Sequence, residues 1–159
     1  MKFTVGQLRE TIGISPETFR HWKRVLPPFA ARVGRTPAFS WGDLLSAAVI
    51  NHLTDHCGVR VGHLATVAQK IVDLCNATPW TALDGNLLIV NIGSNDCVIA
   101  REATDAASTD GALIVCFLAP IITRLRAMLL RDQSPATQAH LRFSVIEVAN
   151  EQQTTRLAK

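Results

Sequence analysis

The chain has 159 residues, of which 48% are hydrophobic and 18% charged, and its formal net charge is +3. A domain commonly holds ~100–200 residues, so this length fits one domain or two small ones that share a compact body. The composition is too apolar for a disordered chain, and the longest apolar run, residues 111–122, is too short to span a bilayer. No apolar segment follows Met1, so we expect a cytoplasmic protein without a secretory signal.

The positive charge lies near the N-terminus. Residues 1–40 carry seven basic and two acidic residues, a net charge of +5. Residues 77–159 carry seven basic and eight acidic residues, a net charge of −1. Such a local excess is typical of a segment that binds nucleic acid, and a solvated basic face is the simpler alternative.

Two short helices are predicted at the start of the chain. The first begins after Thr4, a suitable N-cap, and ends at Gly13. The second begins after Ser15, with Pro16 in its first position, and ends before Pro27. Two helices joined by a short turn that contains glycine are typical of a helix-turn-helix motif.

The second predicted helix is basic on one side and aromatic on the other. Phe19 and Trp22 stand three residues apart, so both are expected in the core. A helix with one apolar edge and polar groups elsewhere fits the major groove of DNA. The side chains predicted to contact DNA lie at the N-cap of this helix, on the helix and on the segment after it: Ser15, Thr18, Arg20, His21, Lys23, Arg24, Arg32 and Arg35.

The segment that follows, residues 27–40, is rich in proline and glycine and contains two arginines. This composition predicts a short two-stranded wing. Two longer helices with apolar stripes are expected over residues 41–56 and 60–75, and Ser40 is the predicted N-cap of the first.

The periodicity changes after residues 76–79. Apolar runs at 87–92 and 97–101 flank a Gly-Ser-Asn-Asp turn, and together they predict a β-hairpin. The remaining expected elements are a strand over 113–118, a helix over 120–131 and a last strand over 141–148.

Four N-terminal segments can be compared with known DNA-binding domains: residues 3–8, 13–22, 39–44 and 53–59. In this order and spacing, the chain resembles the DNA-binding domain of MerR-type transcriptional regulators. The resemblance covers residues 3–75 and implies a winged helix-turn-helix. It also implies that the residue at the position of Arg20 contacts the DNA backbone or a base edge.

Two departures from that family are visible. Family members carry a wing arginine two residues before the position of Phe39, whereas this chain has Pro37 there and Arg35 as its nearest arginine. Many members also dimerise through a long coiled coil, and no heptad run of that length follows Cys75.

The sequence therefore predicts an α+β protein with an all-α winged helix-turn-helix over residues 1–76. A small α+β domain for dimerisation or partner binding is expected over 80–150, followed by a polar tail over 151–159. The predicted partners are double-stranded DNA, a second copy of the chain, and a protein or small-molecule effector at the C-terminal domain. No membrane partner and no cofactor are expected.

The predicted function is sequence-specific transcriptional regulation in a bacterium or prophage. A repressor that binds an inverted repeat as a homodimer is favoured, because one domain reads few base pairs. Two alternatives stay open. One is an excisionase-like factor that bends DNA for recombination, and the other is a protein-interaction adaptor that uses the C-terminal domain.

Other chemistry finds little support in the sequence. His52 and His56 stand four residues apart beside Cys57, a spacing that can hold a metal ion, but no carboxylate occupies the expected neighbouring position. No metal site is therefore predicted. Cys97 and Cys116 lie in apolar runs and are expected in the core. No enzyme is predicted, because no phosphate-binding loop or nucleophile motif occurs.

Overall fold

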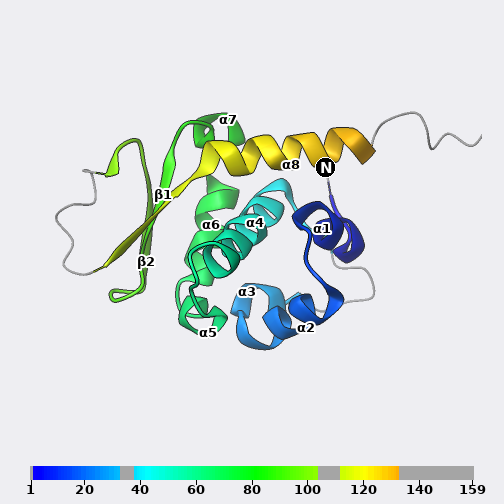
Figure 1. Ribbon diagram of the computed structural model, residues 1–159, viewed down its shortest axis with the longest axis horizontal. Helices are drawn as coiled ribbons and strands as arrows, with labels where there is room; N and C mark the ends of the chain where they lie inside the picture. The colour runs from blue at the N-terminus through cyan, green and yellow to red at the C-terminus, as the bar shows by residue number, and fades with distance from the viewer. Residues whose placement is uncertain (1, 33–37, 104–111, 133–159) are drawn as a thin grey trace, which may run out of the picture.

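The computed structural model describes residues 2–32, 38–103 and 112–132 (Figure 1). Within these ranges the chain forms eight helices and three strands, so the predicted α+β class is confirmed. The elements are, in chain order, α1 (Val5–Ile12), α2 (Pro16–Val25), α3 (Pro27–Ala30), α4 (Trp41–Asp55), α5 (Val61–Leu64), α6 (Ala68–Ala77), α7 (Trp80–Leu83), β1 (Leu87–Asn91), β2 (Asp96–Ala100), β3 (Leu113–Phe117) and α8 (Leu118–Asp132).

The ends of α1 and α2 are those that the sequence predicts. Thr4 and Gln7 form a capping box at the start of α1, and the Ser15 side chain caps α2. Gly13 ends α1 with φ of 82°, a left-handed conformation that glycine adopts without steric cost. The short turn between the two helices therefore follows directly from local signals.

The first part of the predicted wing is instead a helix. Residues 27–30 form α3, with Pro27 and Pro28 at its start, where a proline sacrifices no helical hydrogen bond. Phe29 is buried, and its ring centroid lies 6.0 Å from that of Phe19 and 5.6 Å from that of Trp22. This aromatic contact, which joins residues of different helices, explains why the segment turns inward.

The rest of the predicted wing is described only in part. Phe3 and Phe39 form an isolated antiparallel β-bridge, with hydrogen bonds of 2.8 Å in both directions between their backbones. Residues 33–37, and Arg35 with them, lie outside the described ranges.

The prediction of a single helix over residues 60–75 is wrong, because the chain forms two helices there, α5 and α6. The helix is interrupted at residues 65–67, where Thr66 and Val67 are β-branched and therefore weak helix formers. The Thr66 hydroxyl also donates a hydrogen bond to the Asn95 side chain in the hairpin turn. The second helix, α6, continues to Ala77 and ends just before Thr78, whose backbone is extended as is usual before a proline.

The predicted hairpin and third strand are confirmed. The sheet has the order β2-β1-β3, with both pairs antiparallel. One face packs on the helices through Leu88, Val90, Cys97 and Cys116, all at least 98% buried. The last helix, α8, begins at Leu118, directly after β3 and two residues earlier than predicted. The predicted strand over 141–148 and the tail over 151–159 lie outside the described residues.

The N-terminal helices and the sheet share one hydrophobic core. Its buried side chains run from Phe3 in the N-terminal segment to Leu125 in α8. Figure 1 shows α8 extending from the sheet across α4 to α1, and both helices contact it. The division into domains at residues 76–80 stays a prediction, because this main core runs through both parts of the chain. A second, small cluster of Leu87 and Ile89 lies on the other face of the sheet. Across those ranges, none of the helices combines the length and apolarity needed to cross a bilayer.

Candidate nucleic-acid interface

The helix α2 turns its basic side chains away from the core. Arg20, His21, Lys23 and Arg24 are all exposed, as the sequence predicts for a surface that contacts DNA. On the opposite side, Phe19 is 4% exposed and Trp22 is 1% exposed. The aromatic side chains hold the helix in place, and this leaves the basic side chains free of the core.

The first turn of α2 is shaped by Ser15 and Thr18. The Ser15 Oγ accepts a hydrogen bond of 3.0 Å from the Thr18 backbone N–H and lies 3.0 Å from the Thr18 Oγ1. Both hydroxyl groups lie at the end of the helix where its dipole is positive, an end that favours anions. Their positions suit a role beside a phosphate, and their described contacts serve the helix cap.

Arg20 is held by a weak contact within its own helix. Its Nη1 donates to the Glu17 Oε1 at 3.2 Å, and the two side chains are 73% and 72% exposed. Hydrogen bonds from the Glu17 backbone and from Ser15 lower the pKa of the Glu17 carboxyl, so Glu17 is ionised at neutral pH. An exposed ion pair contributes only ~0–1 kcal/mol, so Arg20 can exchange Glu17 for a phosphate at little cost.

Arg32, which the sequence analysis places among the DNA contacts, is engaged within the fold. Its Nη2 donates to the Asp43 Oδ1 at 2.5 Å, and its Nη1 donates to the Ala38 backbone oxygen at 3.0 Å. The guanidinium also lies over the Phe39 ring, 5.1 Å from the ring centroid. These contacts tie both ends of the segment between α3 and α4 to the core.

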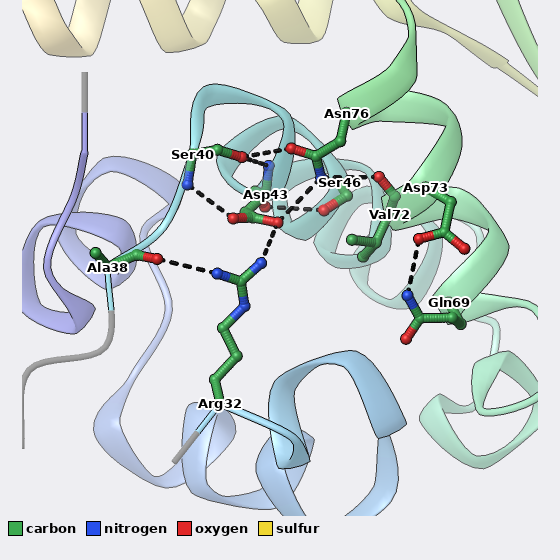
Figure 2. A network of polar contacts seen from close by, with 9 residues as sticks. All are labelled: Arg32, Ala38, Ser40, Asp43, Ser46, Gln69, Val72, Asp73 and Asn76. Carbon is green, nitrogen blue, oxygen red and sulfur yellow. Dashed lines mark hydrogen bonds and ion pairs between the residues drawn. The ribbon is translucent and has the colours of Figure 1, made fainter. Parts of the chain in front are cut away.

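Asp43 is the centre of this polar network (Figure 2). It is 3% exposed and accepts two further hydrogen bonds, from the Ser40 N–H at 2.7 Å and from the Asn76 Nδ2 at 3.0 Å. The Ser40 Oγ donates to the Asn76 Oδ1 at 2.5 Å. The network therefore joins the start of α4 to the end of α6 and to Arg32.

Sequence reasoning identified Ser40 as a cap but missed the rest of this network. The pattern Ser40-x-x-Asp43 is typical of a capping box, and it could have predicted that the Asp43 carboxylate accepts a hydrogen bond at the start of α4. Nothing local to Arg32 or Asn76 indicates their role, because each lies more than ten residues from Asp43 in the sequence.

The histidines and cysteines occupy other positions. The rings of His52 and His56 stack with centroids 4.7 Å apart, and Cys57 is exposed. In the segments that the structure describes, no group of three His, Cys, Asp or Glu side chains is arranged to hold a metal ion. Cys97 and Cys116 are buried core residues as predicted, and burial raises the pKa of each thiol to about 11.

No protein-family model matches this sequence, and no curated protein matches it either. The candidate interface is defined by the exposed basic side chains of α2 and the hydroxyl groups at its start. Its described members are the exposed Arg20, His21, Lys23 and Arg24 of α2, together with the hydroxyl groups of Ser15 and Thr18 at the start of that helix.

Proposed function

We propose that this protein is a DNA-binding transcriptional regulator that inserts α2 into the major groove of double-stranded DNA. The observation that carries the proposal is the two-sided character of α2, with basic side chains exposed and Phe19 and Trp22 buried. An α-helix is ~10–12 Å wide with its side chains, which matches the ~12 Å width of the major groove.

The position of α2 behind a short turn supports the same proposal. α1 and α2 are joined through Gly13, and the Phe3–Phe39 bridge lies next to them in the fold. This order agrees with the resemblance to the winged helix-turn-helix domain of MerR-type regulators. In the proposal, Arg20, His21, Lys23 and Arg24 contact DNA, and Arg32 positions the segment that follows α3.

A repressor that acts as a homodimer on an inverted repeat is the form of regulation that we favour. One α2 reaches only a few base pairs, so a useful specificity requires two copies on neighbouring half-sites. The excisionase-like and adaptor functions have no separate support among the described contacts, and the experiment below distinguishes them.

Selection of bound duplexes from a random pool tests the proposal, followed by gel shifts on the enriched sequence. We expect an inverted repeat, bound by the wild type. Replacing Arg20 by Gln should weaken binding by about 5- to 150-fold, the equivalent of one lost bidentate base contact. The control is Arg101→Gln, which removes an exposed positive charge beyond the end of β2, in the sheet part of the molecule, and should bind as the wild type does.

Three results would count against the proposal. Equal loss of binding in Arg20→Gln and Arg101→Gln would mean that Arg20 contributes only through the net charge of the protein and makes no specific contact with DNA. Enrichment of bent DNA without a defined repeat would favour the excisionase-like function. Absence of any DNA binding at low salt, where non-specific affinity is strongest, would favour the adaptor.

A further inference from the structure

A small cavity lies where α1, α4 and α8 meet. It has a volume of about 40 Å³, enough for a carboxylate group or a few water molecules. Its polar lining comes from all three helices and the end of one of them: Thr11 from α1, Asn51 and His52 from α4, His56 directly after α4, and Arg124 from α8. Figure 1 shows α8 crossing α4 and ending beside α1, so these distant parts of the sequence meet there.

Two of the polar side chains in the cavity are largely buried. Thr11 is 9% exposed and Asn51 is 8% exposed. Neither the Thr11 hydroxyl nor the Asn51 carboxamide makes a hydrogen bond to any other residue that the structure describes. The polar atoms of both side chains are not fully buried, unlike Arg9 Nε and Trp41 Nε1, which are buried without a partner. Thr11 and Asn51 therefore offer accessible hydrogen-bonding groups to a ligand in the cavity.

The cavity also has one permanent positive charge and no negative one. Arg124 supplies the guanidinium, and no acidic side chain is among the lining residues within the described ranges. Burial, together with the electrostatic influence of His56 and Arg124, lowers the pKa of His52 and so favours its neutral form. One fixed positive charge matches a monoanion better than a doubly charged phosphate.

An apolar groove of about 260 Å³ adjoins the cavity. The two share His52, Ile121 and Arg124, and the groove is otherwise lined by Val115, Phe117 and Pro120. Phe117 is 63% exposed, so the groove opens to solvent. A ligand in both would have a charged head at Arg124 and an apolar body along β3 and the start of α8.

From this arrangement we propose that the cavity and groove bind a small organic acid, whose carboxylate contacts Arg124, Thr11 and Asn51 and whose apolar part lies against Val115 and Phe117. The site and its ligand class go beyond the proposed DNA binding. Both are independent of whether α2 contacts DNA.

The same site is connected to the helix-turn-helix. The Arg124 Nη2 lies 4.0 Å from the position that a Cβ on Gly13 would occupy, so this side chain reaches the turn between α1 and α2. A carboxylate that draws Arg124 into the cavity would change the surroundings of that turn. An effect on DNA affinity rests on the proposed function, whereas ligand binding is measured without DNA, so the two can fail separately.

Calorimetric titration of the full chain with hexanoate tests the site, with hexanamide as the uncharged probe of the same shape. A ligand of this size is expected to bind with Kd of about 1 mM. Hexanamide should bind at least about tenfold more weakly, because it lacks the charge that Arg124 recognises. Replacement of Arg124 by Gln should weaken hexanoate binding by about 10- to 100-fold.

Two further variants separate binding from folding. Thr11→Val keeps the shape of the side chain, removes its hydroxyl and should weaken hexanoate binding even where Arg124→Gln fails to fold. The matched control is Arg126→Gln on the same helix, because Arg126 pairs with Asp84 at 3.1 Å and lies outside the cavity. Its binding should equal that of the wild type. Absence of hexanoate binding, equal binding of hexanamide, or unchanged binding in both Arg124→Gln and Thr11→Val would overturn the proposal.

Discussion

Asp43 is a buried carboxylate whose three partners come from separate parts of the chain. Arg32, the Ser40 backbone and Asn76 all donate to it, at 2.5–3.0 Å. Burial of a charge is unfavourable unless donors surround it, so the whole set acts as a unit. The segment after α3 therefore depends on a side chain that the sequence marks only as a helix-capping residue.

Replacing Asp43 by Asn should destabilise the protein by about 2–4 kcal/mol, because the Arg32 guanidinium then loses its charged partner. Urea unfolding of the variant and the wild type measures the difference. The control is Asp73→Asn, which removes an exposed carboxylate that accepts only from Gln69 in Figure 2 and should change stability by less than about 0.5 kcal/mol. Equal losses in the two variants would contradict the role of the network.

His52 makes stability depend on pH. Burial and the electrostatic influence of His56 and Arg124 lower its pKa in the folded chain, so the unfolded chain binds more protons as the pH falls. Stability should therefore decrease as the pH falls below the unfolded value of ~6.5. His52→Gln should flatten this part of the urea-unfolding profile between pH 7.5 and 5.5, whereas exposed His63→Gln should leave it unchanged. An unaltered slope in His52→Gln would contradict the assignment.

Helices α4 and α6 approach each other closely at Gly42. A Cβ there would lie 2.6 Å from the Cys75 backbone oxygen, and a backbone atom cannot yield as a flexible side chain can. Gly42→Ala should therefore destabilise the protein by about 1–3 kcal/mol in thermal or urea unfolding. In contrast, Gly62→Ala in α5 meets no atom within 4 Å and should be neutral or stabilising by up to ~1 kcal/mol. A harmless Gly42→Ala would mean that α4 and α6 lie further apart.

The elements that the sequence predicts correctly are those whose ends are determined by nearby residues. α1, α2, α4 and the hairpin begin and end at caps, glycines and turn residues that can be recognised within a few positions. The helix α3 depends on Phe29 meeting Phe19 and Trp22, and the break before α6 depends on a contact with the hairpin turn. Such contacts between elements leave no periodic signal, so the sequence alone predicts a wing and an unbroken helix.

The candidate sites divide in the same way. The basic side chains of α2 occur within five positions, from Arg20 to Arg24, and helical periodicity places them outside the core. The cavity joins Thr11, Asn51 and Arg124, which are separated by forty or more residues. The sequence could not indicate their proximity, because it depends on where α8 crosses α1 and α4.

The helices and the sheet share one main hydrophobic core in the described ranges. Its buried residues extend from the N-terminal segment into α8, so the helices and the sheet should unfold together. Thermal unfolding followed by tryptophan fluorescence and by far-ultraviolet circular dichroism should give one midpoint. Two separated transitions would contradict a shared core and would favour independent domains divided at residues 76–80.

The dependence of DNA affinity on salt is the most direct test of the role of α2. Fluorescence anisotropy with a mixed-sequence duplex measures the affinity at several salt concentrations, for the wild type and for a variant with Arg20, Lys23 and Arg24 all replaced by Gln. Each phosphate contact contributes ~0.9 to the slope of log affinity against log salt, so the variant should lose about 2–3 from that slope. Arg101→Gln should keep the wild-type slope. Identical slopes for the wild type and the triple variant would contradict the binding of DNA by α2.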